Sequence, residues 1–301
     1  MSDELLNRTA VPELDTILGK SFPVLGKGFV RVVDYMGSDA AIVQAARVSY
    51  GEGTRKVSED RGLIRYLLRH RHTTPFEMCE LKLHVCVPMD IWRQWIRHRT
   101  ANVNEYSTRY SLAIDDKHTT APEAWRKQAI DNKQGSAGFF SPEEGALLSA
   151  EEAELHRHCH DVYNARIEQG VAREQARKDL PLSTYTQAYW KIDLHNLLHF
   201  LALRMEAHAQ QEIRAYATTI GMEIVKRWVP LTWEAFMDYR FNAVTLSQDM
   251  QHLLGMIARG EADAAQDYAR EHGLETNGKP GREIRELEAI LATMQLPSPW
   301  A

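Results

Sequence analysis

The alternation of side chains in "ELKLHVCVP", residues 80–88, constrains the fold most. Apolar residues from Leu81 to Val87 occupy every second position, and polar or small residues stand between them. A period of two is typical of a β-strand with one buried face and one open face, and Pro88 ends the pattern. The segment directly after it, "MDIWRQWIRHR", has helical spacing instead. The two patterns together indicate helices packed on a sheet.

Further strands and helices are predicted along the chain. The strands are "GFVRVVDYMG" (28–37) and the β-branched and aromatic "LSTYTQAYWKI" (182–192). The helices are one opened by a Ser38-Asp39 cap, then segments 58–72, 89–99, 142–170, 194–208 and 209–228. No internal repeat is seen. A single α+β domain is the simplest account.

The domain limits follow from where these patterns weaken. Residues 1–27 are interpreted as an N-terminal arm, mobile over its first twenty or so residues, and residues 28–240 as the domain. Within it, residues 115–145 mix Gly, Pro, Ser and charge without a period, which predicts a surface excursion. Residues 241–301 are expected to form a C-terminal extension, charged and partly helical from 260 onward.

Composition excludes several classes of protein. With 44% apolar residues, seven Trp and eight Phe among 301 residues, the chain can fill a sizeable core. A formal charge of -5 argues against proteins that coat nucleic acid or membrane surfaces. Three cysteines without a CxxC pair favour a reducing cytosol. No apolar run approaches the roughly 20 residues of a membrane-spanning helix, and the N-terminus lacks a signal-peptide pattern. We therefore expect a cytoplasmic protein.

Hydrogen-bonding side chains are concentrated in "RQWIRHRTANVNEYSTRY", residues 93–110. Three guanidinium groups, on Arg97, Arg99 and Arg109, suit a phosphate or diphosphate, because each is always charged and donates in a fixed fork. The interleaved polar residues are suited to reading a heterocycle and a ribose: Asn102, Asn104, Glu105 and Ser107. The alternatives are an exposed, salt-bridged helix end, and an RNA-binding module that uses Arg and Tyr for backbone contact and stacking.

The same stretch closely resembles the signature of the flavin-dependent thymidylate synthases, which is RHR, seven residues, then Ser. The matching residues are Arg97-His98-Arg99, Asn104-Glu105, Ser107 and Arg109-Tyr110. Further blocks look like family blocks in family order: "AARVSY" (45–50), "HTTPFE" (72–77), "ARKDLPLSTYTQAYW" (176–190) and "HNLLHFLALRMEAHAQQEIRAYA" (195–217). The resemblance covers about residues 30–240.

This resemblance implies a fold and a reaction. The fold is a single α+β domain with a mixed or antiparallel sheet core flanked by long helices. The family is a methyltransferase that makes dTMP from dUMP, with methylenetetrahydrofolate as carbon donor, FAD as redox cofactor and NADPH as hydride source. It works as a homotetramer whose sites are shared: one subunit contributes Gln94 and Arg204, and another contributes Ser107, Arg109 and Arg177. A flavoprotein that methylates a different pyrimidine nucleotide is the alternative enzyme.

The resemblance also assigns roles at the nucleotide. The dUMP-binding residues are Gln94, Trp95, Ile96, Arg97, Glu105, Tyr106, Ser107, Thr108, Arg109, Arg177 and Arg204. By residue type alone, Arg204 in the apolar "LLHFLALRM" is a snorkelling arginine at a helix edge. The family match instead makes it catalytic, polarising the uracil edge as N3 loses its proton. Ser107 is assigned to binding, because a serine nucleophile needs an adjacent base and His98 belongs to the cofactor triad.

The flavin contacts implied by the family lie in both halves of the chain. They are Ser49, His72, Thr74, Arg97, His98, Arg99, Glu105, Asp193, Leu194, His195 and His199. The chain departs from the family pattern at Asn102, where Ser is frequent, and at Asp193 and His199, where Asn is frequent. In "HRHCH", His156 and His160 have the spacing of zinc ligands, but without a third ligand nearby a surface pair and no metal are expected.

Overall fold

The computed structural model describes residues 8–48, 60–107, 116–130 and 135–300. The chain divides into two compact units, Met1–Phe241 and Asn242–Ala301, and each has a hydrophobic core of its own. The two units are described separately below.

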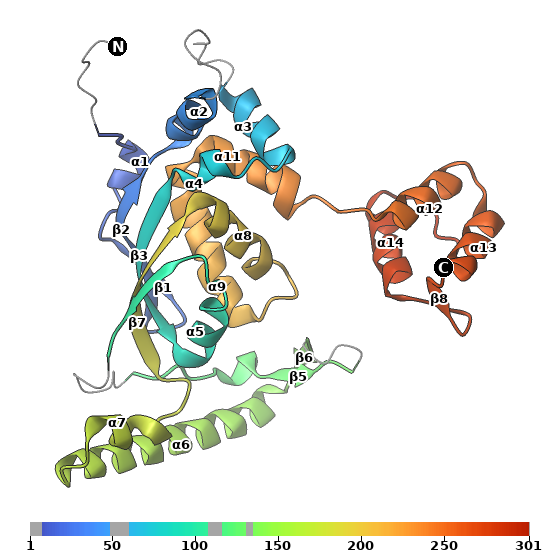
Figure 1. The fold of residues 1–301 in the computed structure, drawn as a ribbon. Coiled ribbons are helices and arrows are strands. Elements are labelled where there is room, and N and C mark those ends of the chain that lie inside the picture. Colours follow the sequence, from blue (N-terminus) through green and yellow to red (C-terminus); the bar gives the residue numbers. More distant parts are fainter. Residues whose placement is uncertain (1–7, 49–59, 108–115, 131–134, 301) are drawn as a thin grey trace, which may run out of the picture. The chain divides into compact units, whose positions relative to one another are not determined.

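A five-stranded antiparallel sheet forms the frame of the first unit (Figure 1). Its strands, in spatial order, are β1 (Ser21–Val24), β2 (Gly28–Met36), β3 (Glu80–Pro88), β7 (Tyr185–Asp193) and β4 (Asn102–Glu105). The expected α+β class with an antiparallel sheet is confirmed, and β2, β3 and β7 lie where the sequence predicts strands. Leu81, Leu83 and Val85 are buried, whereas Lys82 and His84 between them are only half-buried, as the alternation requires.

Strand β4 is not predicted by the sequence analysis, which places a loop after residue 99. Its four residues, "NVNE", are all exposed and carry no β-forming pattern beyond Val103. They become a strand because they pair with the edge of β7, Asn102 opposite Lys191 and Glu105 opposite Ala188. The polar signature is therefore partly a sheet edge.

Three helices cover the buried face of the sheet: α5 (Met89–Trp95), α8 (Leu194–Arg204) and α9 (Gln211–Thr219) (Figure 1). The ring of Trp95 lies 5.2 Å from Trp190 of β7 and 5.0 Å from Phe200 of α8, between ring centroids. The predicted helix 209–228 is three pieces, because a π-helical turn (Ile220–Val225) separates α9 from α10 (Lys226–Trp228).

The remaining helices of this unit are α1 (Pro12–Asp15), α2 (Asp39–Arg47), α3 (Asp60–Arg69), α4 (Thr74–Glu77), α6 (Pro142–Glu168), α7 (Arg173–Ala176) and α11 (Pro230–Phe236), which a π-helical turn (Met237–Phe241) follows. Of these, α6 and α7 pack on each other, and α6 also packs on the excursion. Helix α6 confirms the predicted long helix and begins with a capping box of Ser141 and Glu144. In the part of the chain that the structure describes, no helix is both long enough and apolar enough to cross a membrane.

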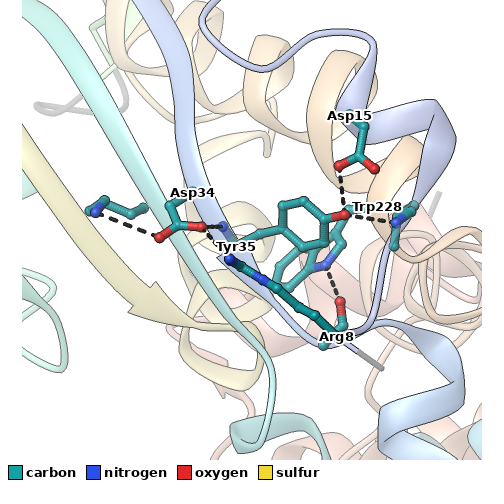
Figure 2. A network of polar contacts seen from close by, with 8 residues as sticks. Arg8, Asp15, Asp34, Tyr35 and Trp228 are labelled. Carbon is teal, nitrogen blue, oxygen red and sulfur yellow. Dashed lines mark hydrogen bonds and ion pairs between the residues drawn. The ribbon is translucent and has the colours of Figure 1, made fainter. Parts of the chain in front are cut away.

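The N-terminal segment is not the arm that the sequence suggests. Leu14 and Ile17 are buried in the main core, and β1 pairs with β2. Figure 2 shows how the segment is held: the Tyr35 hydroxyl donates to Asp15 Oδ1 at 2.7 Å and accepts from the Val11 amide at 2.7 Å. The prediction is wrong for residues 11–27 because the apolar residues there are too few and too irregularly spaced to show a period.

The excursion after β4 is attached at several points. A short 3-10 turn, Pro122–Ala124, precedes a two-stranded hairpin of β5 (Arg126–Gln128) and β6 (Ser136–Phe139). Glu152 of α6 accepts from the Thr120 amide at 2.6 Å, and Arg126 forms an ion pair of 2.7 Å with Glu212 of α9. The hairpin therefore belongs to the first unit, joined to both α6 and α9.

The second unit is more ordered than the charged, partly helical tail that the sequence suggests. It contains α12 (Gln248–Ala258), α13 (Ala262–Glu271), α14 (Arg282–Thr293) and a small hairpin of β8 (Glu275–Thr276) and β9 (Lys279–Pro280). Each helix buries a narrow stripe, for example Leu253 and Ile257 of α12 or Leu287 and Leu291 of α14. The stripes are too short to stand out from the surrounding charge in sequence.

Asp39 caps α11, a helix that is distant in sequence, and its loss should therefore lower stability. Its carboxylate accepts from the Leu231 and Thr232 amides and the Thr232 hydroxyl, at 2.7–3.0 Å, whereas the N-cap of α11, Val229, offers no side-chain bond. We expect Asp39→Ala to lower the free energy of unfolding by about 2 kcal/mol in urea titrations followed by tryptophan fluorescence.

The control is Asp238→Ala, which removes an ion pair to Arg65 from a side chain that is 53% exposed. Exposed ion pairs contribute little, so the loss there should stay below about 1 kcal/mol. Equal losses in the two variants would mean that the Asp39 cap is no stronger than a surface contact.

Candidate functional site

Arg204, at the C-terminal end of α8, joins three of the segments that the sequence singles out. Its Nε donates to His98 Nε2 at 3.1 Å, and one of its Nη atoms donates to the main-chain oxygen of Gln94 at 3.2 Å. The side chain is half-buried, and this burial lowers the pKa of Arg204. Among the described residues it forms no ion pair with a carboxylate. The guanidinium is therefore held in a fixed orientation with its charge uncompensated.

His98 must be neutral to accept this bond, because both ring nitrogens of a charged imidazole are donors. Burial lowers the pKa of His98 to about 4, and the positive charges of Arg204 and His199 act in the same direction. Its ring also packs edge-on against Phe200, with centroids 4.9 Å apart. The bond to Arg204 requires the tautomer with the proton on Nδ1.

Arg97 and Arg99 flank His98 and are exposed. Within the described ranges neither makes a hydrogen bond or an ion pair, so two more guanidinium groups beside Arg204 lack acidic partners. Just before them, Gln94 near the end of α5 donates to Gln210, and Ile96, which follows the helix, is exposed. This end of α5 can hold an anionic ligand.

Trp95 and Leu194 limit what the predicted contacts can be. Both side chains are 0% exposed and belong to the main core. Only the main-chain atoms of these two residues can reach a ligand. Trp95 and Leu194 are buried because each lies on the face of its helix, α5 or α8, that packs against the sheet.

A second group of predicted residues follows β4. Glu105 Oε1 accepts from the Thr186 hydroxyl at 2.8 Å, and the Tyr106 amide donates to the Gln187 carbonyl at 2.8 Å. A shallow pocket of about 200 Å³ lies here, and its lining includes His84, Asn104, Glu105 and Tyr106. Ser107 comes next and is half-buried, whereas Thr108, Arg109 and Tyr110 lie outside the described residues.

The two groups are not joined within one chain by any polar contact between described residues. Arg177 stands apart from both in sequence, at the start of a 3-10 turn (Arg177–Asp179) after α7. Gln94, His98 and Arg204 lie at the ends of α5 and α8, whereas Ser107 follows β4. The structure thus assembles one half of the predicted nucleotide site, around Arg204, and leaves the other half separate.

The predicted flavin residues outside the triad fall into two places. His72 and Thr74 line a hollow of about 650 Å³ between α2, α3 and α4, whereas Ser49 lies outside the described residues. Asp193, where the family frequently has Asn, caps α8: its carboxylate accepts from the Asn196 amide at 2.9 Å and from the Asn196 side chain at 2.6 Å. Both oxygens of Asp193 are thereby engaged in the fold.

His195 and His199 follow on α8. His195 is half-buried, and the His199 ring lies 6.0 Å from that of His98. Burial lowers the pKa of His199, helped by the charges of Arg240 and His195. Asn102, the third departure from the family pattern, is exposed on β4.

The histidines of α6 correct one expectation. His156 is buried, and its Nε2 lies 2.8 Å from the Ser183 hydroxyl just before β7, so it is not a surface residue. His160 bonds instead to Asn164 on the same helix. The spacing alone could not show that the His156 face of α6 packs on the chain that leads into the sheet.

Sequence reasoning missed Gln210, which bonds with Gln94 across 116 positions. It lies between α8 and α9, and its neighbour Glu212 bonds with Arg126 of the hairpin. No local pattern connects these segments. The block "HAQQEIRAYA" could have marked Gln210 as a candidate site residue, because its amides and carboxylate precede an apolar helix.

Comparison with known proteins gives consistent results. The family model described as thymidylate synthase complementing protein matches residues 31–231. The flavin-dependent thymidylate synthase of Wolbachia pipientis wMel is 52% identical over 259 residues, 86% of this chain and 91% of that protein. That of Ruegeria pomeroyi is 52% identical over 289 residues, 94% of this chain and 92% of the relative.

Solved structures are similar as well. A UMP/dUMP methylase, PolB from Streptomyces cacaoi, bound with 5-Br dUMP, has a TM-score of 0.66 and 29% identity, covering 73% of this chain and 99% of its own. The same protein bound with 5-Br UMP has a TM-score of 0.65 and 30% identity, with 72% and 97% coverage.

The buried position of His98 leads to a prediction about protonation. Because its pKa is lowered from an ordinary 6.5 to about 4, the unfolded chain binds this proton first as pH falls. We expect nitrogen-detected NMR to show His98 neutral, with the proton on Nδ1, at every pH from 8 to about 5. Above pH 6.5 His98 is neutral in both the folded and the unfolded chain and costs no stability. As pH falls from there toward 4, the unfolded chain takes up the proton and the folded state loses stability. His98 titrating near 6.5 would contradict the buried, accepting geometry.

Proposed function

The chain belongs to the flavin-dependent thymidylate synthase family, and from this we propose that it converts dUMP to dTMP. Methylenetetrahydrofolate donates the carbon, FAD is the redox cofactor and NADPH supplies the hydride. The observation that carries the proposal is the guanidinium of Arg204, oriented by His98 and the main chain of Gln94 and lacking an acidic partner in the described ranges.

Arg204 acts on the pyrimidine in this proposal. Methylation at C5 requires that carbon to be nucleophilic, and negative charge develops on the pyrimidine edge when N3 loses its proton. A fixed guanidinium stabilises that charge without reorganising, and its own charge cannot be given up. His98 stays neutral beside it and so adds no competing charge. Gln94 and the exposed Arg97 bind the same nucleotide.

The residues present fit a flavin with a diphosphate. Arg97 and Arg99 are exposed and unpaired within the described residues, and forked donors of this kind suit a diphosphate. His72 and Thr74 line a hollow that can take another part of the same group. When bound, the flavin carries reducing equivalents from NADPH to the transferred carbon. Asp193 and the histidines of α8 complete the predicted flavin contacts, and the Asp193 carboxylate also caps α8.

The nucleotide site is completed by a second subunit of a homotetramer. Support comes from the separate elements that carry the two groups: Arg204 of α8 bonds with His98 and Gln94 at the end of α5, whereas Ser107 follows β4 and Arg177 begins the 3-10 turn after α7. One subunit then supplies the Arg204 group, and another supplies Ser107, Arg109 and Arg177.

UMP is a second candidate substrate. The similar PolB structures are of a UMP/dUMP methylase, and both nucleotides carry the same base. The two differ only in the ribose 2′-hydroxyl, so the preference depends on side chains at the sugar.

The direct test is dTMP formation from dUMP, methylenetetrahydrofolate and NADPH by the purified, yellow protein, with UMP assayed in parallel. We expect wild type to turn over dUMP and Arg204→Lys to lose at least tenfold in kcat while retaining its flavin, because an ammonium cannot reproduce a forked contact. Ser107→Ala is the control: it should weaken dUMP binding and leave measurable catalysis. A wild type that binds no FAD and forms no dTMP would end the proposal.

Mixing inactive variants tests the shared site. Arg204→Ala and Arg177→Ala tetramers should each be inactive, but after subunit exchange both intact faces meet at about a quarter of sites if pairing is random. Partial recovery of activity is therefore expected in hybrids identified by native mass spectrometry. Hybrid tetramers as inactive as both parents would place the two arginines in one chain.

A further inference from the structure

A line of four polar side chains runs from the β5–β6 hairpin to Gln94. Arg126 Nη2 donates to both carboxylate oxygens of Glu212, at 2.7 and 3.0 Å. Glu212 also bonds with the side chain of Gln210, and Gln94 Nε2 donates to Gln210 Oε1. The line therefore connects an excursion that no sequence motif marks with a residue of the proposed nucleotide site.

The chemistry of the groups fixes the direction of every bond. A carboxylate only accepts, so the amide nitrogen of Gln210 must face Glu212. The amide oxygen of Gln210 then faces Gln94 and can be satisfied only by the Gln94 nitrogen. As a result, Gln94 is left with its side-chain oxygen free to accept a further hydrogen bond.

Glu212 is held in its charged form. Burial pulls its pKa upward, but hydrogen bonds from Arg126 and Gln210 outweigh this and hold the pKa of Glu212 below its ordinary value. The side chains of Arg126 and Glu212 are only 23% and 16% exposed, so solvent screens the pair weakly. Arg126 donates to Gln211 as well, at 2.7 Å, which fastens the start of α9.

Gln94 is thus fixed from two sides, since its main-chain oxygen accepts from Arg204 and its side chain bonds with Gln210. We propose that Arg126, Glu212 and Gln210 are positioning residues that set which way round the Gln94 amide lies, so that its oxygen accepts a hydrogen bond from the nucleotide. The inference rests on the proposed function, because the nucleotide is dUMP. The hairpin then tunes substrate affinity without touching the substrate.

The test is a double-mutant cycle on dUMP affinity, measured by calorimetry on the flavin-loaded protein. Glu212→Gln keeps the size of the side chain, but the new amide can donate as well as accept. It therefore no longer forces one orientation on the Gln210 amide, and through it on the Gln94 amide. We expect it to weaken dUMP binding about five- to tenfold and raise KM similarly, with kcat at saturating dUMP nearly unchanged. In a Gln94→Ala background, Glu212→Gln should have no further effect, since it acts only through Gln94.

Glu152→Gln is the matched control. Glu152 holds the same excursion, through Thr120, but has no bond to Gln210 or Gln94. It should leave dUMP affinity within twofold of wild type. Additive losses for Glu212→Gln and Gln94→Ala, or an unchanged affinity in Glu212→Gln, would overturn the positioning role. A wild type that binds no dUMP would instead overturn the proposed function itself, which separates the two failures.

Discussion

The packing of Trp95 between sheet and helices is the contact on which the site depends. Its ring meets Trp190 of β7, Phe200 of α8 and Tyr216 of α9, with centroids 5.0–5.8 Å apart. The indole nitrogen of Trp95 is buried without a hydrogen-bond partner among the described residues, a cost that the surrounding apolar contacts must offset. Because α5 and α8 are locked against the same rings, His98 and Arg204 are brought within bonding distance although 106 positions separate them.

The charges around this core are distributed unequally. Several other arginines of the first unit are paired with carboxylates, as Arg65 is with Glu234 and Arg126 with Glu212. Among the described residues, half-buried Arg204 forms hydrogen bonds only with a neutral imidazole and a main-chain carbonyl. An arrangement of this kind destabilises the free protein and is relieved by an anion, which is a property of binding sites rather than of scaffolds.

Sequence reasoning succeeded where the pattern is local. The alternation at 80–88 predicted β3, and the RHR signature includes His98, which bonds with Arg204. It failed where the cause is distant: β4 exists only through pairing with β7, and Asp39 caps a helix almost two hundred positions away. His156 and Trp95 show a third limit, since a residue type says nothing of which helix face turns inward.

The two separate hydrophobic cores make the chain two cooperative units, so one midpoint cannot describe its unfolding. Of its seven tryptophans only Trp300 lies in the second unit, beside Glu275, to which its indole donates at 2.7 Å. Intrinsic fluorescence therefore reports almost entirely on the unit that carries Arg204. A loss of structure confined to residues 242–301 would be nearly silent by that signal and would have to be followed by backbone amide exchange.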